Sequence, residues 1–332
     1  MPPIRTLTAL CLTAALAAPA ARADSPIPAP AASAPAELAG VPFGTMDFDW
    51  RDESRSRSVP VRLYLPDAAA AGKPVPLVVF SHGIGGSRMG YSYLGRYWAS
   101  QGYASLHLQH VGSDRNLWAG NPFGLVGRLR DAAQDKEAIA RVLDLHFALD
   151  QLLAGPLASR IDADRIVAAG HSYGANTTLL AAGAQVERAG QKLDFRDARI
   201  KAAIILSAPP FYGETDPAKV LAGITVPTLH VTATEDIIRI PGYYSGATDR
   251  VAVFDATGGP RKALAVFSGG SHSMFTDRSG TGGMALNPKV KDATRALSLA
   301  FLKDVFDGED AALRQWPAQF AGIVARYTRL GL

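Results

Sequence analysis

Six short and mostly apolar segments recur along the chain and constrain its fold more than any other feature. They lie at residues 76–83, 104–110, 165–172, 202–210, 228–236 and 263–273, and none alternates cleanly between apolar and polar residues. Strands that are buried on both faces of a parallel sheet have this composition. The sequence therefore predicts a central, mostly parallel sheet covered by helices on both faces.

Helical patterns fill most of the connections between these segments. The clearest pattern spans residues 131–153, where one apolar stripe includes Ile139, Val142 and Leu149. A second amphipathic stretch, at residues 295–308, ends at Gly308, and glycine often follows the last turn of a helix. Strands that alternate with helices predict an α/β fold.

Two further segments precede the first apolar run and differ from it in pattern. Residues 44–50 and 59–66 alternate apolar and polar side chains around a charged turn, which is typical of an antiparallel hairpin. The predicted fold is therefore an α/β sandwich with one mixed sheet that starts with an antiparallel N-terminal hairpin, and no connection is long enough for a large cap domain. In such sheets, functional side chains gather at the carboxyl ends of the strands.

The first 42 residues differ in composition from the rest of the 332-residue chain. Residues 1–5 carry one positive charge, an apolar stretch follows, and Ala21-Arg22-Ala23 has the A-x-A pattern of a cleavage site. We therefore expect residues 1–23 to be a signal peptide, with export to the periplasm or the medium. Residues 24–42 are rich in alanine and proline and are expected to form a linker, so the catalytic domain is expected at residues 43–332. The apolar stretch is too short to span a bilayer, and no transmembrane segment is predicted.

Cysteine content and charge exclude several kinds of site. The single cysteine, Cys11, lies in the expected signal peptide, so the mature chain would have no disulfide, thiolate metal ligand or cysteine nucleophile. The formal net charge is +4, and basic residues are scattered rather than gathered in the stripe that nucleic-acid binding requires. We therefore expect no nucleic-acid partner.

A serine between two glycines stands where a predicted strand meets a predicted helix. Gly170-His171-Ser172-Tyr173-Gly174 matches the pattern G-x-S-x-G. The turn is so sharp that only small residues fit two positions on either side of the serine. It exposes the hydroxyl above the sheet and directs the next backbone N–H into the same space. This context predicts that Ser172 is a nucleophile, because a structural turn alone would not require both flanking elements.

A serine nucleophile needs a base within reach, and the chain has seven histidines. His272 lies on a glycine-rich loop directly after the last apolar segment, from which an imidazole can reach the edge of the sheet. The others lie on predicted strands, on a helix stripe, in the elbow, or in a loop that the side chain would brace: His82, His107, His110, His146, His171 and His230. We therefore predict that His272 is the general base.

The imidazole in turn needs an acid that fixes its tautomer and stabilises the imidazolium. Glu235 and Asp236 end the apolar segment that lies between Ser172 and His272 in the chain, and either can serve. We favour Asp236, which lies further from the strand, where the chain turns over the sheet. The order serine, acid, histidine differs from that of chymotrypsin and of subtilisin.

Two backbone N–H groups are expected to bind a developing oxyanion. One follows the nucleophile, at Tyr173. The second is expected in the loop of residues 81–86, where glycines let the backbone approach a substrate and Ile84 is the predicted donor. A glycine-rich loop can bind phosphate instead, but this one lacks the lysine of a P-loop and the spacing of a dinucleotide-binding loop.

With these residues in place, the chain from residue 46 to residue 332 resembles the α/β-hydrolase superfamily. The likeness rests on "FSHGIGGSR", "GHSYGANT", "TED" and "GGSH", in this order. Within the superfamily the chain is most similar to the bacterial predicted dienelactone hydrolases and to the platelet-activating-factor acetylhydrolase type. This resemblance implies serine esterase chemistry without cofactor or metal, with Ser172, Asp236 and His272 as the triad and Ile84 and Tyr173 as the oxyanion pair.

The resemblance has one departure. True dienelactone hydrolases carry a cysteine nucleophile at the position of Ser172, so ester hydrolysis is the expected activity. We expect short to medium acyl esters, or a polyester, as substrates, in a pocket formed by residues 111–130, 209–223 and 237–249. These connections carry the aromatic side chains Trp118, Phe123, Phe211, Tyr212, Tyr243 and Tyr244. The alternatives are a peptidase or other acyl hydrolase of the same fold, and a catalytically silent binding module.

Overall fold

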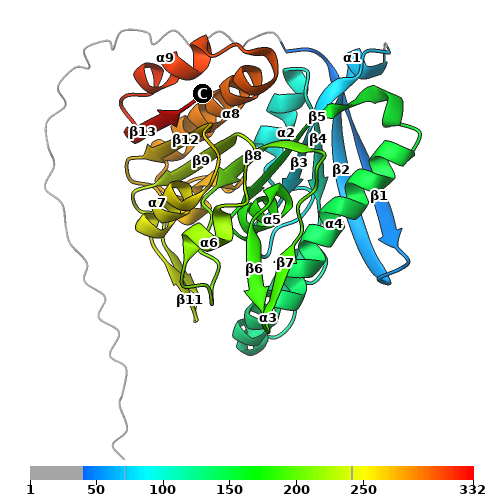
Figure 1. Cartoon of the computed structure of the whole chain (residues 1–332), viewed down its shortest axis with the longest axis vertical. Coiled ribbons are helices and arrows are strands. Elements are labelled where there is room, and N and C mark those ends of the chain that lie inside the picture. The colour runs from blue at the N-terminus through cyan, green and yellow to red at the C-terminus, as the bar shows by residue number, and fades with distance from the viewer. Residues whose placement is uncertain (1–39, 71, 241) are drawn as a thin grey trace, which may run out of the picture. The chain divides into compact units, whose positions relative to one another are not determined.

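Nine strands form the central sheet in the described part of the chain, in the order β1-β2-β4-β3-β5-β8-β9-β12-β13 (Figure 1). The computed structural model describes residues 40–70, 72–240 and 242–332. The expected signal peptide and most of the expected linker lie outside these residues. The strands are β1 (Phe43–Asp52), β2 (Arg57–Pro66), β3 (Val75–Ser81), β4 (Ala104–Leu108), β5 (Ile161–His171), β8 (Ile200–Leu206), β9 (Thr228–Ala233), β12 (Lys262–Phe267) and β13 (Val324–Leu330).

The middle of the sheet is parallel, and both of its edges are antiparallel. Six neighbouring strands, β4, β3, β5, β8, β9 and β12, pair in parallel. The β1–β2 hairpin joins β4 antiparallel, as predicted, and β13 joins β12 antiparallel at the other edge. The predicted fold class is thus confirmed. β13 was not predicted, because its half-exposed residues include two arginines and lack the apolar composition of the inner strands.

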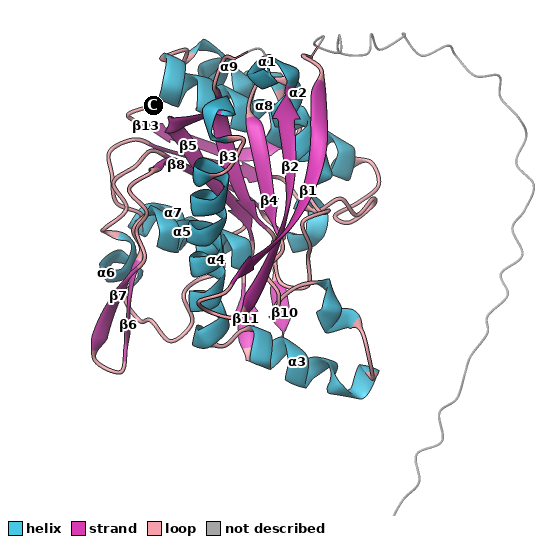
Figure 2. Cartoon of the chain, turned by 90° about the vertical axis from the view of Figure 1, so that its right-hand side faces the viewer, coloured by secondary structure: helices cyan, strands magenta, loops and turns pink. Residues whose placement is uncertain are grey.

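Helices cover both faces of the sheet, as Figures 1 and 2 show. Side chains alternate between the faces along β3: Leu77 and Val79 belong to one core, whereas Val78 and Phe80 belong to the other. The first core includes residues of α4 (Asp135–Ala154), α5 (Tyr173–Ala182), α6 (Pro217–Leu221) and α7 (Ala247–Ala256). The second includes residues of α2 (Ser92–Ser100), α8 (Leu286–Asp307) and α9 (Ala311–Gln319).

The helix predicted at residues 131–153 is two helices in the structure. Asp131 and Ala132 end α3 (Leu125–Ala132), and α4 begins only at Asp135. Gln134 between them has an extended backbone, with φ −68° and ψ 154°, so the chain changes direction there. The helix predicted at residues 295–308 starts earlier, at Leu286, and stops at Gly308, whose φ of 72° favours glycine.

The remaining elements are two hairpins and several short helical segments. Two hairpins lie outside the main sheet, β6 (Gln185–Arg188) with β7 (Gln191–Asp194), and β10 (Ile238–Ile240) with β11 (Tyr243–Ser245). Figure 2 shows both hairpins in the lower half of the view, with β10–β11 beside α3 and β6–β7 at the left. The remaining short elements are α1 (Asp67–Ala70) and the 3₁₀ turns η1 (Arg115–Trp118), η2 (Pro122–Gly124), η3 (Ala158–Arg160) and η4 (His272–Phe275).

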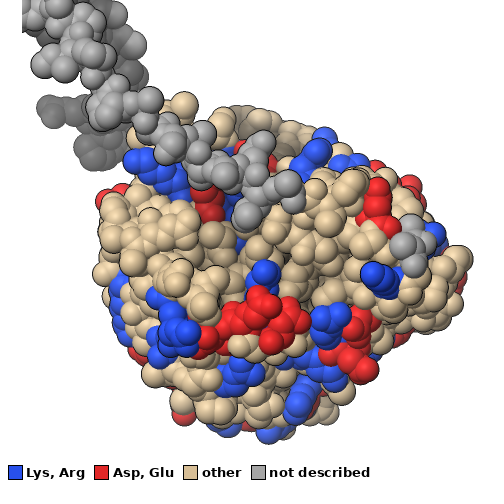
Figure 3. Space-filling view, turned by 90° about the horizontal axis from the view of Figure 1, so that it is seen from above, with Lys and Arg blue, Asp and Glu red and all other residues tan. Residues whose placement is uncertain are grey.

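Charged side chains of both signs alternate over the face drawn in Figure 3, which shows no continuous basic stripe. In the part of the chain that the structure describes, no helix combines the length and the apolar composition needed to cross a membrane.

The turn from β5 into α5 brings two glycines against neighbouring backbone. A Cβ atom on Gly174 would lie 1.9 Å from the carbonyl oxygen of Ser81 at the end of β3. A Cβ atom on Gly170 would lie 2.2 Å from the carbonyl oxygen of Gly174. Both distances are far inside van der Waals contact, so the packing of α5 on the sheet requires glycine at both positions.

We predict that Gly174→Ala lowers the free energy of unfolding by at least about 3 kcal/mol, because the added methyl group overlaps rigid backbone. Gly127→Ala is the matched control, since a Cβ atom on Gly127 in α3 meets nothing within 4 Å. That control is expected to be neutral or to stabilise by up to about 1 kcal/mol through helix propensity. Urea unfolding of both variants makes the measurement, and equal stabilities would contradict the prediction.

Candidate active site

Ser172 lies in the turn between β5 and α5, at the carboxyl end of the parallel strands. Its backbone has φ 56° and ψ −122°, a strained conformation for a residue with a side chain. The backbone N–H of Ser172 donates to the carbonyl oxygen of Leu206 at the end of β8 (2.9 Å), which anchors the turn to the sheet. Strain of this kind is characteristic of a nucleophile elbow.

The structure brings the three predicted triad residues together. The hydroxyl of Ser172 donates to His272 Nε2 over 2.8 Å, and His272 Nδ1–H donates to Asp236 Oδ1 over 2.7 Å. His272 is the first residue of η4, just beyond β12, and Asp236 follows β9. This hydrogen-bond chain has the geometry of a Ser-His-Asp triad.

The carboxylate of Asp236 is fully buried and has four polar neighbours. Its Oδ2 accepts hydrogen bonds from Ser207 Oγ (2.5 Å) and Thr232 Oγ1 (2.7 Å), and Arg250 Nη2 lies 3.6 Å from Oδ1. Burial opposes ionisation, but the hydrogen bond and charge of His272, together with Arg250 and Ser207, hold the pKa of Asp236 below its usual range. Asp236 is therefore a stable anion at neutral pH. Glu235, the alternative acid, is exposed.

A second, neutral histidine braces His272. His171 Nε2–H donates to the carbonyl oxygen of His272 (2.9 Å), and His171 Nδ1 accepts from the hydroxyl of Tyr91 (2.8 Å). That hydroxyl in turn accepts from the backbone N–H of Gly83 (3.2 Å). Burial, helped by the charge of His272, lowers the pKa of His171 to about 3, so its ring remains uncharged. The bracing role was not predicted, because only the position of His171 in the elbow is visible in the sequence.

The two predicted oxyanion donors lie beside Ser172. The backbone N–H groups of Ile84 and Tyr173 make no hydrogen bond to any described part of the chain. The loop around Ile84 is fixed on its far side, since Gly85 N–H donates to the carbonyl oxygen of Ser113 (2.8 Å) and Trp118 Nε1 donates to the carbonyl oxygen of Gly85 (2.8 Å). A Cβ atom on Gly83 would lie 3.2 Å from Ser172 Cβ, so the loop approaches the serine closely.

A cavity of about 290 Å³ opens beside the serine and both donors. Its walls are mostly apolar and come from α3, α4, α5, the β6–β7 hairpin and the segments that follow β8 and β9. Side chains that line it include Ile84, Leu129, Ile139, Leu180, Val186, Leu193, Phe195, Phe211, Tyr212, Ile238 and Tyr243.

The cavity agrees only in part with the predicted pocket. Phe211, Tyr212 and Tyr243 line it as expected. Trp118 and Phe123 do not line it and are exposed, with Phe123 96% accessible. Tyr244 is likewise exposed, and the contribution of the β6–β7 hairpin was not predicted. The hairpin is short and mostly polar, so its few apolar residues do not indicate in the sequence that they line a cavity.

Among the described residues, no group of three or more histidine, cysteine, aspartate or glutamate side chains is arranged to bind a metal ion.

Comparisons with known proteins agree with the fold. The family model described as "Platelet-activating factor acetylhydrolase, isoform II" matches residues 54–116, which include the loop around Ile84 but none of the three triad residues. The structure of a ferulic acid esterase from Streptomyces cinnamoneus is similar, with a TM-score of 0.62 and 24% identity. The similarity covers 84% of this chain and 94% of that one. No curated protein sequence matches significantly. The chain therefore has the α/β-hydrolase fold.

Replacing each of two neighbouring carboxylates by an amide, one at a time, shows which of them is the acid. We predict that Asp236→Asn lowers kcat by about 10⁴-fold on an ester substrate, because the amide no longer holds the imidazole in the required tautomer or stabilises the imidazolium. Glu235→Gln removes the same charge one residue earlier, at an exposed position, and is expected to leave kcat within about threefold. A large loss in the Glu235 variant with little loss in the Asp236 variant would reverse the assignment.

Buried neutral histidines make stability depend on pH. Burial lowers the pKa of His107 to about 4 and the pKa of His171 and of His230 to about 3. Below pH about 6.5 the unfolded chain binds protons that the native state excludes, so the free energy of unfolding falls as the pH decreases. Each such group steepens the dependence by about 1.4 kcal/mol per pH unit.

We therefore expect the urea midpoint to be nearly constant from pH 7 to 8.5 and to fall steeply between pH 6.5 and 4.5. His230→Leu is the matched variant, because His230 takes no part in the triad hydrogen bonds and its Nε2 has no partner in the described chain. Its slope should be shallower than that of the wild type. A wild-type midpoint that does not change on acidification would exclude this mechanism.

Proposed function

We propose that the protein hydrolyses carboxylic esters by two-step acyl transfer at Ser172. One observation carries the proposal: the continuous hydrogen-bond chain from Asp236 through His272 to Ser172 ends at an apolar cavity beside two backbone N–H groups without partners in the described chain. The family model names an acetylhydrolase and the similar structure is an esterase, so both relatives act on esters.

In the proposed reaction, His272 Nε2 takes the proton of Ser172 as Oγ attacks the ester carbonyl carbon. The N–H groups of Ile84 and Tyr173 then bind the oxyanion, and each such donor contributes about 3 kcal/mol to the stability of the transition state. His272 returns the proton to the leaving alcohol oxygen, and an acyl-enzyme remains. A water molecule repeats the sequence, releases the acid and restores Ser172.

The positions of the triad and the cavity suggest which half of the ester the cavity receives. The leaving oxygen must lie near His272 Nε2, because it takes its proton there. His272 does not line the cavity, whereas Ser172, Ile84 and Tyr173 do. The acyl group therefore enters the cavity, and its mostly apolar walls favour uncharged acyl groups of short to medium length. The alcohol leaves on the side of His272.

The proposal includes export, supported by the apolar stretch and the Ala21-Arg22-Ala23 motif in the sequence. Secretion is tested by expressing the full chain in a bacterial host and determining the N-terminal residue of the product, which is expected to be Asp24. A product that keeps Met1 and remains in the cytoplasm would overturn this part of the proposal.

We predict that the wild type hydrolyses p-nitrophenyl esters and that Ser172→Ala loses at least about 10³-fold in kcat. The substrates range from acetyl to palmitoyl esters, and the profile is expected to favour the shorter acyl groups over palmitoyl. Ser100→Ala, in α2, is the control for expression and handling. A p-nitroanilide series distinguishes a peptidase, for which amides would be cleaved as readily as esters.

A fluorophosphonate probe separates the remaining outcomes. Labelling of the wild type at Ser172 without turnover of any test ester would mean that the substrate class is wrong. If the probe does not label the wild type, the chain is a binding module and the proposed chemistry fails. Full activity in Ser172→Ala would show that the nucleophile lies elsewhere.

A further inference from the structure

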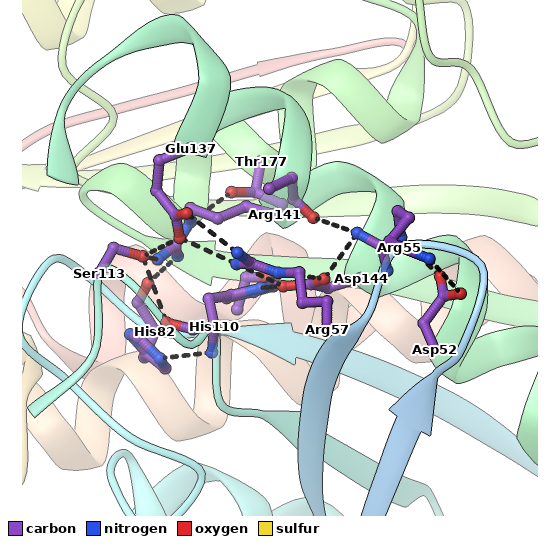
Figure 4. Close-up of polar contacts among 12 residues, drawn as sticks. Asp52, Arg55, Arg57, His82, His110, Ser113, Glu137, Arg141, Asp144 and Thr177 are labelled. Carbon is purple, nitrogen blue, oxygen red and sulfur yellow. Dashed lines mark hydrogen bonds and ion pairs between the residues drawn. The ribbon is translucent and has the colours of Figure 1, made fainter. Parts of the chain in front are cut away.

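A fully buried arginine lies behind the candidate active site. Arg141 belongs to α4, and its relative exposure is 0%. Its guanidinium donates to three acceptors: Nε to Thr177 Oγ1 (3.1 Å), Nη1 to Ser113 Oγ (2.7 Å), and Nη2 to the carbonyl oxygen of His82. Figure 4 shows these contacts, which join α4, α5 and two loops.

Each acceptor belongs to a residue that is linked, through the chain or through one hydrogen bond, to the segment that carries one of the two proposed oxyanion donors. The carbonyl of His82 precedes Ile84 by two residues. The carbonyl of Ser113 accepts from the N–H of Gly85, immediately after Ile84. Thr177 lies one helical turn after Tyr173 and donates through Oγ1 to the Tyr173 carbonyl oxygen (3.2 Å). Arg141 therefore holds the loop on both sides of Ile84 together with the first turn of α5.

The charge of Arg141 is not neutralised by direct contact. Within the described chain no carboxylate lies within 4.0 Å of its guanidinium, although other arginines in the same cluster have such partners. Its Cζ instead lies 4.5 Å from the ring centroid of Tyr173. The neighbouring carboxylates bind elsewhere: Glu137 pairs with Arg57 and accepts from Ser113, and Asp144 pairs with Arg55 and Arg57.

Burying a charge without a paired carboxylate has a large cost in solvation free energy. The presence of Arg141 here therefore indicates that the cation has a function. Burial lowers the pKa of Arg141 to about 10, which still leaves the group cationic at neutral pH. Negative charge in this reaction develops at the oxyanion, which the Ile84 and Tyr173 N–H groups face. A fixed cation on the other side of Tyr173 favours that charge and needs no reorganisation when it forms.

We propose that Arg141 is a positioning residue for the oxyanion hole: it clamps the loop around Ile84 to the elbow helix, so that the two N–H groups converge on one oxygen, and its unpaired charge favours the oxyanion. The inference rests on the proposed esterase function. It assigns a role in the transition state to a side chain that touches no substrate and does not line the cavity.

The cluster in Figure 4 supplies a matched control. Arg55, on the β1–β2 turn, pairs with Asp52 and Asp144 and donates to the carbonyl oxygen of Ala140. None of these partners is bonded to the loop around Ile84 or to the first turn of α5. Arg55→Met therefore removes a partly buried arginine of the same cluster and is expected to lower the unfolding temperature without changing the chemistry at Ser172.

The test measures the reaction of Ser172 with a fluorophosphonate, in which Ser172 Oγ attacks phosphorus, fluoride leaves and His272 takes the proton. The phosphonyl oxygen occupies the oxyanion hole, so the first-order inactivation constant reports on the hole, and the half-saturation concentration reports on reversible binding. We expect Arg141→Met to lower the inactivation constant, and kcat on an ester, by about 100-fold, with half-saturation and KM within about threefold of the wild type.

Two further variants separate geometry from charge and guard against misfolding. Arg141→Lys keeps the charge but cannot direct three hydrogen bonds from a planar group, and is expected to lose about 10-fold. Thr177→Val removes the acceptor of Nε and the hydrogen bond from Thr177 Oγ1 to the Tyr173 carbonyl oxygen, leaves the other two contacts of Arg141 in place, and is expected to lose less than Arg141→Lys. All rates are measured at a temperature where circular dichroism shows every variant to be folded. If Arg141→Met does not fold, Arg141→Lys and Thr177→Val decide the test.

The inference is overturned if Arg141→Met keeps the inactivation constant and kcat within about threefold of the wild type. If Arg141→Met does not fold, the inference is overturned when both Arg141→Lys and Thr177→Val stay within that range. It is also overturned if Arg55→Met loses as much rate as Arg141→Met, because the loss would then come from the stability of the whole cluster. A wild type that does not react with the probe rejects the proposed function itself, and with it the role of Arg141. A reactive wild type with an unaffected Arg141 variant rejects the inference alone.

Discussion

The close approach of the β5–α5 turn to the end of β3 is the constraint on which the rest of the site depends. Gly174 packs against the carbonyl groups of Ser81 and His82, with no space for a side chain. This contact sets the distance between Ser172 and the loop that carries Ile84. Arg141 donates to the same His82 carbonyl from the other side, so the end of β3 is fixed by packing on one side and by a hydrogen bond on the other. The proposed oxyanion donors and the proposed nucleophile are therefore positioned by the same contact between α5 and the end of β3.

Charge in the site is restricted to a few groups by burial. Burial keeps His82, His110 and His171 neutral, because each pKa is well below the usual range. As neutral rings they act as fixed donors and acceptors: His82 Nδ1–H donates to the Gly83 carbonyl (2.6 Å), and His82 Nε2 accepts from the N–H of His110 (3.1 Å). The anion of Asp236 and the cation of Arg250 lie beneath His272. The charge that changes in the proposed reaction is thus confined to His272 and the oxyanion.

Motifs at strand ends could be predicted from the sequence, whereas contacts between distant segments could not. Ser172, Asp236 and His272 stand at turns that can be recognised from a few consecutive residues. The parallel sheet brings such turns to one edge. Arg55 and Arg57 illustrate the limit: in the sequence they belong to a turn in which acids and bases alternate, which is typical of solvated charge. In the structure they reach carboxylates on α4, at least 80 residues away. The role of Arg141 could not be predicted for the same reason, because a lone arginine on an amphipathic helix gives no sign of being buried.

One wall of the cavity lies outside the main sheet, unlike the candidate catalytic residues. Ser172, Asp236 and His272 follow strands of the parallel part of the sheet. The β6–β7 hairpin, which supplies Val186 and Leu193, is a two-stranded ribbon outside it, held by the packing of these two side chains on one core and by ion pairs of Arg188 with Asp135 and Glu214. A two-stranded hairpin has little stability of its own, and partly exposed ion pairs contribute about 1 kcal/mol or less each. Residues on this hairpin can therefore change the size of the acyl site without altering the geometry of the triad, because no hydrogen bond of the triad passes through it.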